Sequence, residues 1–273
     1  MKEITFGQYY PSNSFVHKMD ARIKILLTIA YIVAVFLVKS YHFLGFLACF
    51  AFVVLVTLIA KIPFVKVLKS VKAILFFIVL SAVIQVFFNR QGTPLWEGGF
   101  ITDLGLLSAG FIVARITLIV LGASLLTFTT SPVEIADGIE SLMYPLKFIK
   151  FPVHEFALIM SIALRFIPTL IGETDRIIKA QKARGADFEN GNVFKRAKAL
   201  IPVLIPLLIS SFRRAEELAD AMDARCFAGS KNRTKYKKMK LTYRDLLGVL
   251  VVGALITGVV FLNKFYLILS VAL

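Results

Sequence analysis

The residues best suited to bind a partner are two arginines, each at the end of a short repeated motif. The motif Ala-x-x-Ala-Arg occurs in "KAQKARGAD" and again in "DAMDARCFAG", where its residues are Ala180, Ala183, Arg184, Ala221, Ala224 and Arg225. A guanidinium group presents several N–H donors in a fixed plane, and these match a carboxylate or phosphate in a two-point contact. The repeat therefore predicts two binding points for acidic groups on another protein.

Each arginine shares one helix face with two earlier residues, because positions four and seven apart line up along a helix. These residues are Ile177 and Ala180 in the first copy, and Leu218 and Ala221 in the second. The small alanines allow another backbone to come close. We therefore expect this face to pack against a partner.

The residue after each arginine decides how the helix ends. Gly185 follows Arg184 and suits the left-handed conformation that closes many helices. Cys226 follows Arg225 and carries a Cβ, which disfavours that conformation. The sequence leaves open whether Cys226 turns the second helix end as Gly185 turns the first.

Two long helices are expected to carry the motifs, from about Val153 to Arg184 and from about Val193 to Arg225. Prolines lie inside both helices, at Pro168, Pro202 and Pro206. Each proline removes a backbone donor and clashes with the preceding turn, which predicts kinks.

A shorter helix is expected before these two. Ser131 is placed to cap it, with Pro132 at its first position and Glu134 at its third. From Thr130 to Lys240, charged residues interrupt the apolar ones at helical spacing. This pattern is typical of amphipathic helices and not of independent membrane spans.

The rest of the chain is apolar enough to cross a membrane. Of its 273 residues, 58% are hydrophobic, whereas a soluble domain is usually nearer half apolar. A spanning helix needs about 20 apolar residues, and five spans are predicted: Ile23 to Val38, Phe43 to Ala60, Ala73 to Phe88, one within Phe100 to Thr127, and Tyr243 to Leu262. The expected fold is all-α, a polytopic helical membrane protein with long, Pro-kinked cytoplasmic helices.

The spans and amphipathic helices predict three parts of the chain. Residues 1–130 form a membrane domain with four spans, 131–240 a cytoplasmic coupling domain with the two long helices, and 241–273 a last membrane span. Basic residues set the orientation, because basic loops stay in the cytoplasm. Lys and Arg concentrate before the first span, between the second and third, and between residues 130 and 244. Five spans place all three regions on one side, so the N-terminus and the coupling domain are expected in the cytoplasm.

The segment "KNRTKYKKMK", Lys231 to Lys240, is the densest basic stretch in this pattern. We expect it to attract anionic membrane lipid, by about 1 kcal/mol for each basic residue near the surface. Attraction to lipid does not explain Arg184 and Arg225 at the ends of the long helices, since these arginines lie within a repeated motif.

Four segments together resemble the transmembrane (T) component of energy-coupling factor transporters, a family that imports vitamins and metal ions. They are "HKMDARIKIL", "ALRFIP", "AQKARGAD" and "AMDARCFAGSKNRT", and the resemblance covers nearly the whole chain. This sequence departs from the family pattern at Ala21, where proline is usual, and at Cys226, where glycine is also common. The two Ala-Arg motifs are the most specific part of the resemblance.

The resemblance implies a membrane scaffold without catalytic activity. Such a scaffold joins a substrate-binding membrane subunit to two cytoplasmic ABC ATPase subunits in the cell membrane. Arg184 and Arg225 would then dock into the ATPase pair, one in each, and the apolar faces of the long helices would carry the substrate-binding subunit. This chain would bind neither the vitamin nor a cofactor, and its partner ATPases would use ATP and magnesium.

An enzyme is the first alternative. Asp220 and Asp223 in "DAMDAR" are similar to the Asp-rich motif of membrane phosphotransferases that move CDP-linked groups. Such a site needs several carboxylates around a divalent metal, and no further pair of aspartates follows here. The chain also lacks the G-x-x-x-x-G-K-[ST] loop, so it does not hydrolyse ATP by the P-loop route.

An ion- or proton-coupled carrier is the second alternative. Arg115 lies deep in a predicted span, and a charge inside the membrane is a hint of function. It could equally face a neighbouring helix or reach toward the membrane surface. The histidines at 17, 42 and 154 have no ligand spacing, so no metal site is predicted.

Overall fold

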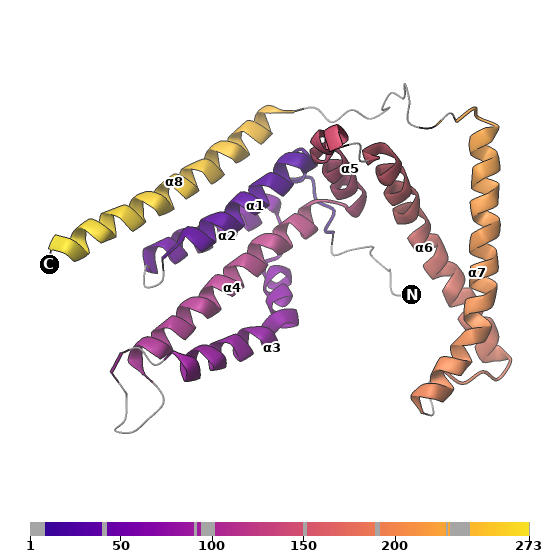
Figure 1. Ribbon diagram of the computed structural model, residues 1–273, viewed down its shortest axis with the longest axis horizontal. Helices are drawn as coiled ribbons and strands as arrows, with labels where there is room; N and C mark the ends of the chain where they lie inside the picture. Colours follow the sequence, from indigo (N-terminus) through magenta and orange to yellow (C-terminus); the bar gives the residue numbers. More distant parts are fainter. Residues whose placement is uncertain are drawn as a thin grey trace. The chain divides into compact units, whose positions relative to one another are not determined.

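The computed structural model describes residues 9–39, 43–89, 92–93, 102–149, 152–188, 192–227, 229 and 241–272. Within these residues the protein is helical and has no β-strand (Figure 1). Its elements are α1 (Ala21–Leu37), α2 (Phe43–Ala60), α3 (Phe64–Phe88), α4 (Asp103–Thr129), α5 (Pro132–Leu142), the 3₁₀ helix η1 (Tyr144–Ile149), α6 (Val153–Ala183), α7 (Val193–Asp223) and α8 (Tyr243–Ala272). The predicted all-α fold is confirmed.

The chain divides into two compact units. The first, which we call the membrane unit, comprises Gly7–Ser141 and Met239–Leu273 and holds α1 to α4, almost all of α5, and α8. The second, which we call the long-helix unit, includes Leu142–Lys238 and holds η1, α6 and α7. The basic segment Lys231–Lys240 lies outside the described residues.

Five helices are long and apolar enough to cross a membrane: α2, α3, α4, α6 and the part Tyr243–Lys264 of α8. Four of them contain predicted spans, but α6 corrects the expectation of an amphipathic helix that could not span. Most of its charged residues gather from Glu173 onward, so the preceding stretch is apolar enough by itself. The predicted first span is α1, whose 17 residues leave it outside this set of five.

The starts of α5 and α3 compare differently with the sequence prediction. The N–H of Glu134 donates to Ser131 Oγ and the N–H of Ser131 donates to Glu134 Oε2, both at 3.3 Å, so the predicted cap of α5 is confirmed. Helix α3 begins at Phe64, well before the predicted Ala73. Lys66, Lys69 and Lys72 of the link between the second and third predicted spans therefore lie on the first turns of α3, whereas Lys61 precedes the helix.

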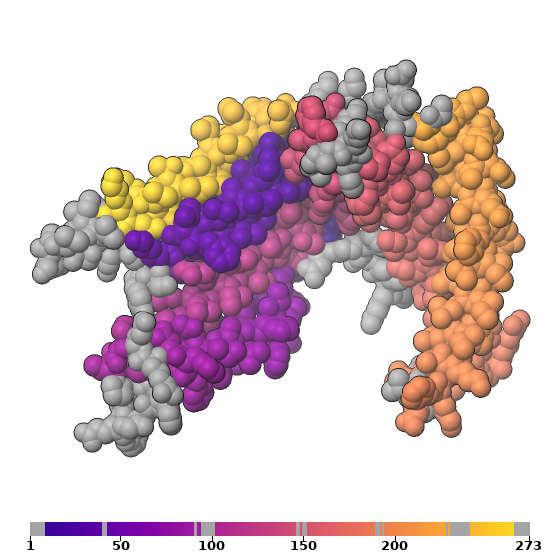
Figure 2. Space-filling model, viewed as in Figure 1, coloured from indigo at the N-terminus to yellow at the C-terminus, as the bar shows by residue number. Residues whose placement is uncertain are grey.

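The membrane unit packs around α4. Helix α3 runs along α4, and α1 and α2 each contact both α4 and α8; Figure 2 shows α8 lying along α1. Tyr31, Val53 and Leu121 are almost fully buried where these helices meet. Gly122 lets α1 and α4 approach, because a Cβ there would overlap the Tyr31 ring.

The C-terminal end of α1 is held by side chains from two other helices. Arg115 of α4 donates from Nη2 to the carbonyl of Val38 at 2.6 Å, and its guanidinium lies 5.6 Å from the centre of the Phe46 ring. Asn263 of α8 donates to the carbonyl of Leu37 at 2.7 Å. The last carbonyls of a helix have no partner within it, so Arg115 satisfies a helix end within the packed core.

The N-terminal end of α1 is joined to the end of α4 by a buried lysine. Lys24 is 5% exposed, and its ammonium donates to the carbonyls of His17 at 3.1 Å and Thr129 at 3.0 Å. Water cannot replace these bonds in a membrane interior, where unpaired polar groups are costly. Lys24 therefore fixes the position of α1 against α4.

A buried aspartate extends this junction to α8. Asp245 is 3% exposed; one carboxylate oxygen accepts the N–H of Asp20 at 2.8 Å, and the other accepts the N–H of Thr242 at 2.7 Å. Asp20 in turn caps α1 by accepting the N–H of Arg22 at 3.0 Å. The "HKMDARIK" segment therefore forms a polar junction between the starts of α1 and α8 and the end of α4.

His17 fixes the segment that leads into α1. Its Nε2 donates to the carbonyl of Tyr10 at 2.9 Å, and its Nδ1 lies 2.7 Å from the Ser14 hydroxyl. Because a carbonyl only accepts, the neutral ring carries its proton on Nε2 and Nδ1 accepts from Ser14. Burial lowers the pKa of His17, which favours this neutral ring.

We predict that Lys24→Met destabilises the membrane unit, because the buried Thr129 carbonyl and the partly buried His17 carbonyl lose their donor. The expected loss is about 2–4 kcal/mol in the free energy of unfolding, which lowers Tm by several degrees in detergent micelles. Lys18→Met is the control, since Lys18 is exposed on the same segment. Equal Tm values for the two variants would show that the Lys24 ammonium does not hold the junction.

Candidate functional site

The long-helix unit is an antiparallel pair. Glu173 of α6 accepts a hydrogen bond from the Ser210 hydroxyl of α7 and pairs with Arg214, whose Nη2 lies 3.0 Å from Glu173 Oε2. Further along α6, Gln181 Nε2 donates to the carbonyl of Pro202 at 3.5 Å. Residue numbers rise in α6 as they fall in α7, so the two helices run in opposite directions.

All three predicted kink prolines lie inside continuous helices. Pro168 is within α6, and Pro202 and Pro206 are within α7. Figure 1 shows α7 changing direction in its first half, where its two prolines fall. All three rings are exposed, so they contribute to the outer surface of the pair.

The end of α6 forms a closed turn directly after Arg184. The N–H of Gly185 donates to the carbonyl of Lys182 at 3.0 Å, and the N–H of Ala186 donates to that of Gln181 at 3.0 Å. Gly185 has a φ of 89°, in the left-handed region. These two bonds and this φ define a Schellman motif, with Arg184 as the residue just before the turn.

The end of α7 forms the same turn after Arg225. The N–H of Cys226 donates to the carbonyl of Asp223 at 2.9 Å, and the N–H of Phe227 donates to that of Met222 at 3.0 Å. Cys226 has a φ of 54°, so it adopts the left-handed conformation in spite of its Cβ. The question that the sequence left open is settled: Cys226 turns this end as Gly185 turns the other.

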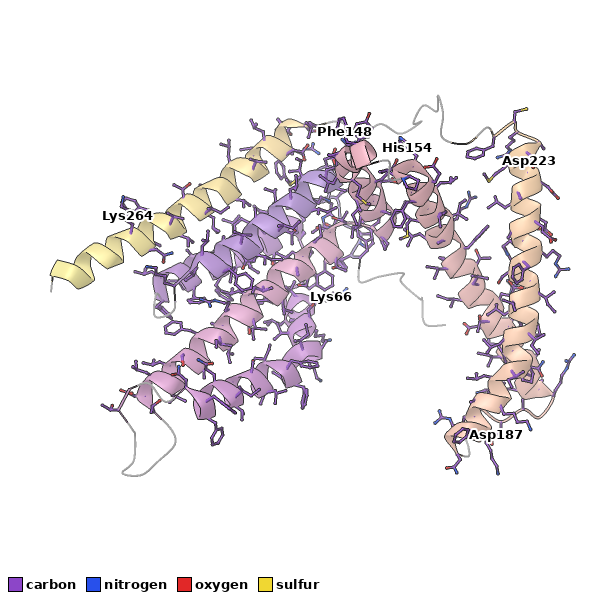
Figure 3. All side chains as sticks on the ribbon, viewed as in Figure 1. Lys66, Phe148, His154, Asp187, Asp223 and Lys264 are labelled. Atoms are coloured by element: carbon purple, nitrogen blue, oxygen red, sulfur yellow. The ribbon has the colours of Figure 1, made fainter. Side chains whose placement is uncertain are left out.

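The two helix ends, which we call the coupling tips, are Ala183–Gly185 and Ala224–Cys226, and all six residues are exposed. Each presents an arginine immediately before the turn. They lie at opposite ends of α7, as the labels of Asp187 and Asp223 in Figure 3 make visible. A straight helix of the 31 residues in α7 would be about 46 Å long. The tips are therefore two separate exposed surfaces.

Comparisons with known proteins identify the family. The family model described as "CbiQ: Cobalt transport protein" matches residues 12–236. The chain is similar to the energy-coupling factor transporter transmembrane protein EcfT of several bacteria. It is 46% identical to that of Clostridium kluyveri over 253 residues, covering 92% of this chain and 93% of the relative. Identity to the Ruminiclostridium cellulolyticum protein is 50% over 249 residues (90% and 92%), and to that of Bacillus subtilis 41% over 264 residues (94% and 98%).

This chain belongs to the EcfT family. It is therefore a multi-pass membrane protein and the non-catalytic transmembrane component of an energy-coupling factor transporter. The resemblance stated from the sequence motifs is confirmed over more than nine-tenths of the chain.

In this EcfT chain four of the residues predicted to pack against a partner lie near the tips, and the three prolines predicted with them lie further along the helices. Ile177 and Leu218 are half-buried, while Ala180 and Ala221 are exposed. The same helices expose many large apolar side chains, among them Ile159, Leu204, Ile205, Leu208, Ile209 and Phe212, each more than half exposed. Large exposed apolar patches mark interaction surfaces, so these faces have the character of a protein or lipid interface.

The residues that suggested a phosphotransferase or an ion-coupled carrier do not form a common site in the described part of this EcfT chain. Asp220 and Asp223 are exposed, and the described residues contain no group of three side chains that could hold a metal ion. Arg115 is engaged at the end of α1, and His17 in the junction. His42 lies outside the described residues.

We predict that Cys226→Gly stabilises the second tip, since it removes the cost of a left-handed residue with a Cβ, about 1–2 kcal/mol. One kcal/mol corresponds to roughly a fivefold change in an opening equilibrium. Hydrogen–deuterium exchange of peptides covering residues 222–227 should slow by at least that factor. Cys226→Ala is the matched control, because it removes the thiol and keeps the Cβ. Equal slowing in both variants would assign the effect to the thiol.

Proposed function

We propose that this chain is the energy-coupling scaffold of an importer of vitamins or other micronutrients. In this proposal it links two cytoplasmic ABC ATPase subunits to a substrate-binding membrane subunit. ATP and magnesium are used by the ATPases, and the chain itself binds neither these nor the imported substrate. The main support for this proposal is the matched pair of coupling tips. The EcfT relatives, which are named as energy-coupling factor transporter transmembrane proteins, support it further.

The geometry of the tips supports the docking of two ATPase subunits. Arg184 and Arg225 are both exposed and both precede the same backbone turn. The turn satisfies the last carbonyls of each helix without using the arginine side chain, which leaves the guanidinium available for a carboxylate on a partner. Two equivalent tips at opposite ends of α7 suit two similar subunits, one at each tip.

The exposed apolar faces of α6 and α7 support a second contact. Both helices carry large exposed apolar side chains, and Ala180 and Ala221 are small exposed residues of the same two helices. In our proposal these faces hold the substrate-binding membrane subunit. Motion of the ATPases would move the tips, and the rigid helices would pass that motion to the bound subunit.

The distribution of basic residues supports an orientation. We propose that the N-terminus and the coupling domain, residues 131–240, face the cytoplasm. The basic starts of α1 and α3 would then lie at the cytoplasmic side of the cell membrane, as the positive-inside rule requires. The tips would reach the compartment in which the ATPases work.

We predict that the double variant Arg184→Glu and Arg225→Glu abolishes ATP-driven uptake. Removing one partner of a buried charge pair typically costs 2–5 kcal/mol, and a reversed charge adds repulsion. Co-purification of both ATPase subunits should fall at least tenfold, while the protein still inserts into the membrane. The matched control is Arg176→Glu with Arg213→Glu, two exposed arginines on the same helices but away from the tips. Full ATPase recovery with the tip variant would refute the docking role.

We predict that Ala180→Trp and Ala221→Trp each block uptake, because an indole prevents the close approach of a partner backbone. Recovery of the substrate-binding subunit with the purified complex should fall, whereas ATPase recovery should stay nearer to normal. Lys179→Trp and Asp220→Trp are the controls, since these neighbours are exposed on other faces of the same turns. Normal uptake by both alanine variants would show that these faces contact water or lipid.

A further inference from the structure

A groove between α3 and α4 in the membrane unit has a basic end and an apolar length. Its volume is about 630 Å³, and its lining is Lys66, Lys69, Ser70, Ala73, Ile74, Ile119, Val120, Ala123, Ser124, Thr127 and Phe128. The lysines lie on the first turns of α3 and Thr127 on the last turn of α4. Both helices are long and apolar enough to span, so this end of the groove lies near a membrane surface.

The basic end has no acidic counterpart. Neither α3 nor the second half of α4 contains an Asp or Glu, and within the described residues Lys66 and Lys69 form no ion pair. The Lys66 ammonium lies 4.2 Å from the centre of the Tyr10 ring. The N–H of Tyr10 donates to the carbonyl of Phe128 at 3.0 Å, which fixes that ring at the end of α4. One cation is therefore held in place at the mouth of the groove.

A hydroxyl beside the lysines has no partner. Ser70 Oγ is shielded from solvent and makes no hydrogen bond within the described part of the chain. Several other hydroxyls of the spanning helices bond to a carbonyl of their own helix, such as Thr57 to Val53 at 2.7 Å and Ser124 to Leu121 at 2.8 Å. A shielded hydroxyl without a partner is costly, so an acceptor supplied by a ligand would satisfy Ser70.

The rest of the groove is suited to hydrocarbon. Ala73 and Ile74 of α3 face Ile119, Val120 and Ala123 of α4 across it. On each helix these residues lie up to eight positions from the basic end, a depth of about 12 Å. An apolar channel that starts at the membrane surface beside two cations has the layout of a phospholipid, with its headgroup at the lysines and an acyl chain along the helices.

We propose that this groove binds one anionic phospholipid. The phosphate accepts hydrogen bonds from Lys66, Lys69 and Ser70, and one acyl chain lies between α3 and α4. Charge complementarity selects a negatively charged headgroup over a zwitterionic one. The bound lipid covers an apolar surface of α3 that the chain itself leaves open, and it holds the basic start of α3 at the membrane surface.

The test is native mass spectrometry of the purified full-length protein with phosphatidylglycerol or phosphatidylcholine of identical acyl chains. Phosphatidylglycerol should be retained preferentially. Lys66→Gln with Lys69→Gln should weaken its binding roughly thirtyfold, given an attraction of about 1 kcal/mol between each lysine and anionic lipid. Lys72→Gln is the matched control, an exposed lysine of the same helix outside the groove, and should retain the lipid. A loss of the same size with Lys72→Gln would overturn the proposal.

A second arm tests the acyl part of the groove. Ala73→Trp should displace phosphatidylglycerol by filling the channel, whereas Leu75→Trp, exposed and outside the lining, should not. Glycerol 1-phosphate, which has the charge but no acyl chain, should fail to compete. Effective competition by it would identify a site for soluble phosphate, and equal retention of both phospholipids would identify only a lipid-facing surface. Either result would overturn the proposal.

Discussion

The ammonium of Lys24, held between two backbone carbonyls, is the interaction on which the membrane unit depends. Helix ends leave carbonyls and N–H groups without partners, and an apolar environment offers no water to satisfy them. At the N-terminal end of α1, Lys24 donates to the carbonyls of His17 and of Thr129 at the end of α4, and Asp245 accepts the N–H of Asp20. At the C-terminal end, Arg115 of α4 and Asn263 of α8 donate to the last carbonyls. The bonds that satisfy α1 thereby also fix its neighbours.

The coupling tips also have helix-end carbonyls that need donors, but they satisfy them without help from another element. Each closes its last carbonyls with amides of its own next residues, so no other element is needed to hold the turn. The side chain of the arginine before the turn is therefore not needed to cap the helix. A helix end that is complete in itself and still presents a free cation can bind a partner without first losing internal bonds. The same independence lets two tips with different turn residues, Gly185 and Cys226, share one geometry.

The sequence predicts those features that depend on neighbouring residues. The bounds of α6 and α7 fall within two residues of expectation, and the cap of α5 forms as expected, because each rests on local backbone bonding. The sequence did not predict the polar junction, although "HKMDARIK" was recognised as a family motif. Lys24 bonds to backbone carbonyls, which carry no sequence signal, and Asp245 is more than two hundred positions away from Asp20. Cys226 could not be decided, because the cost of its left-handed φ is close to the worth of the two bonds that the turn closes.

The basic residues of this chain differ in how far they are buried and in which groups they bond, and these differences indicate different roles. Lys24 donates hydrogen bonds to backbone carbonyls inside the fold, and Arg115 donates one to the carbonyl of Val38 at the end of α1. Arg184 and Arg225 are exposed on self-sufficient helix ends. Lys66 and Lys69 face an apolar groove with no acid along its lining. Net charge alone would assign all of these cations to membrane attraction. The bonds that each cation makes separate the internal caps from the cations that we propose for protein docking and for lipid binding. Lys24 and Arg115 already bond to carbonyls inside the fold, so moving either cation to a partner would break those internal bonds.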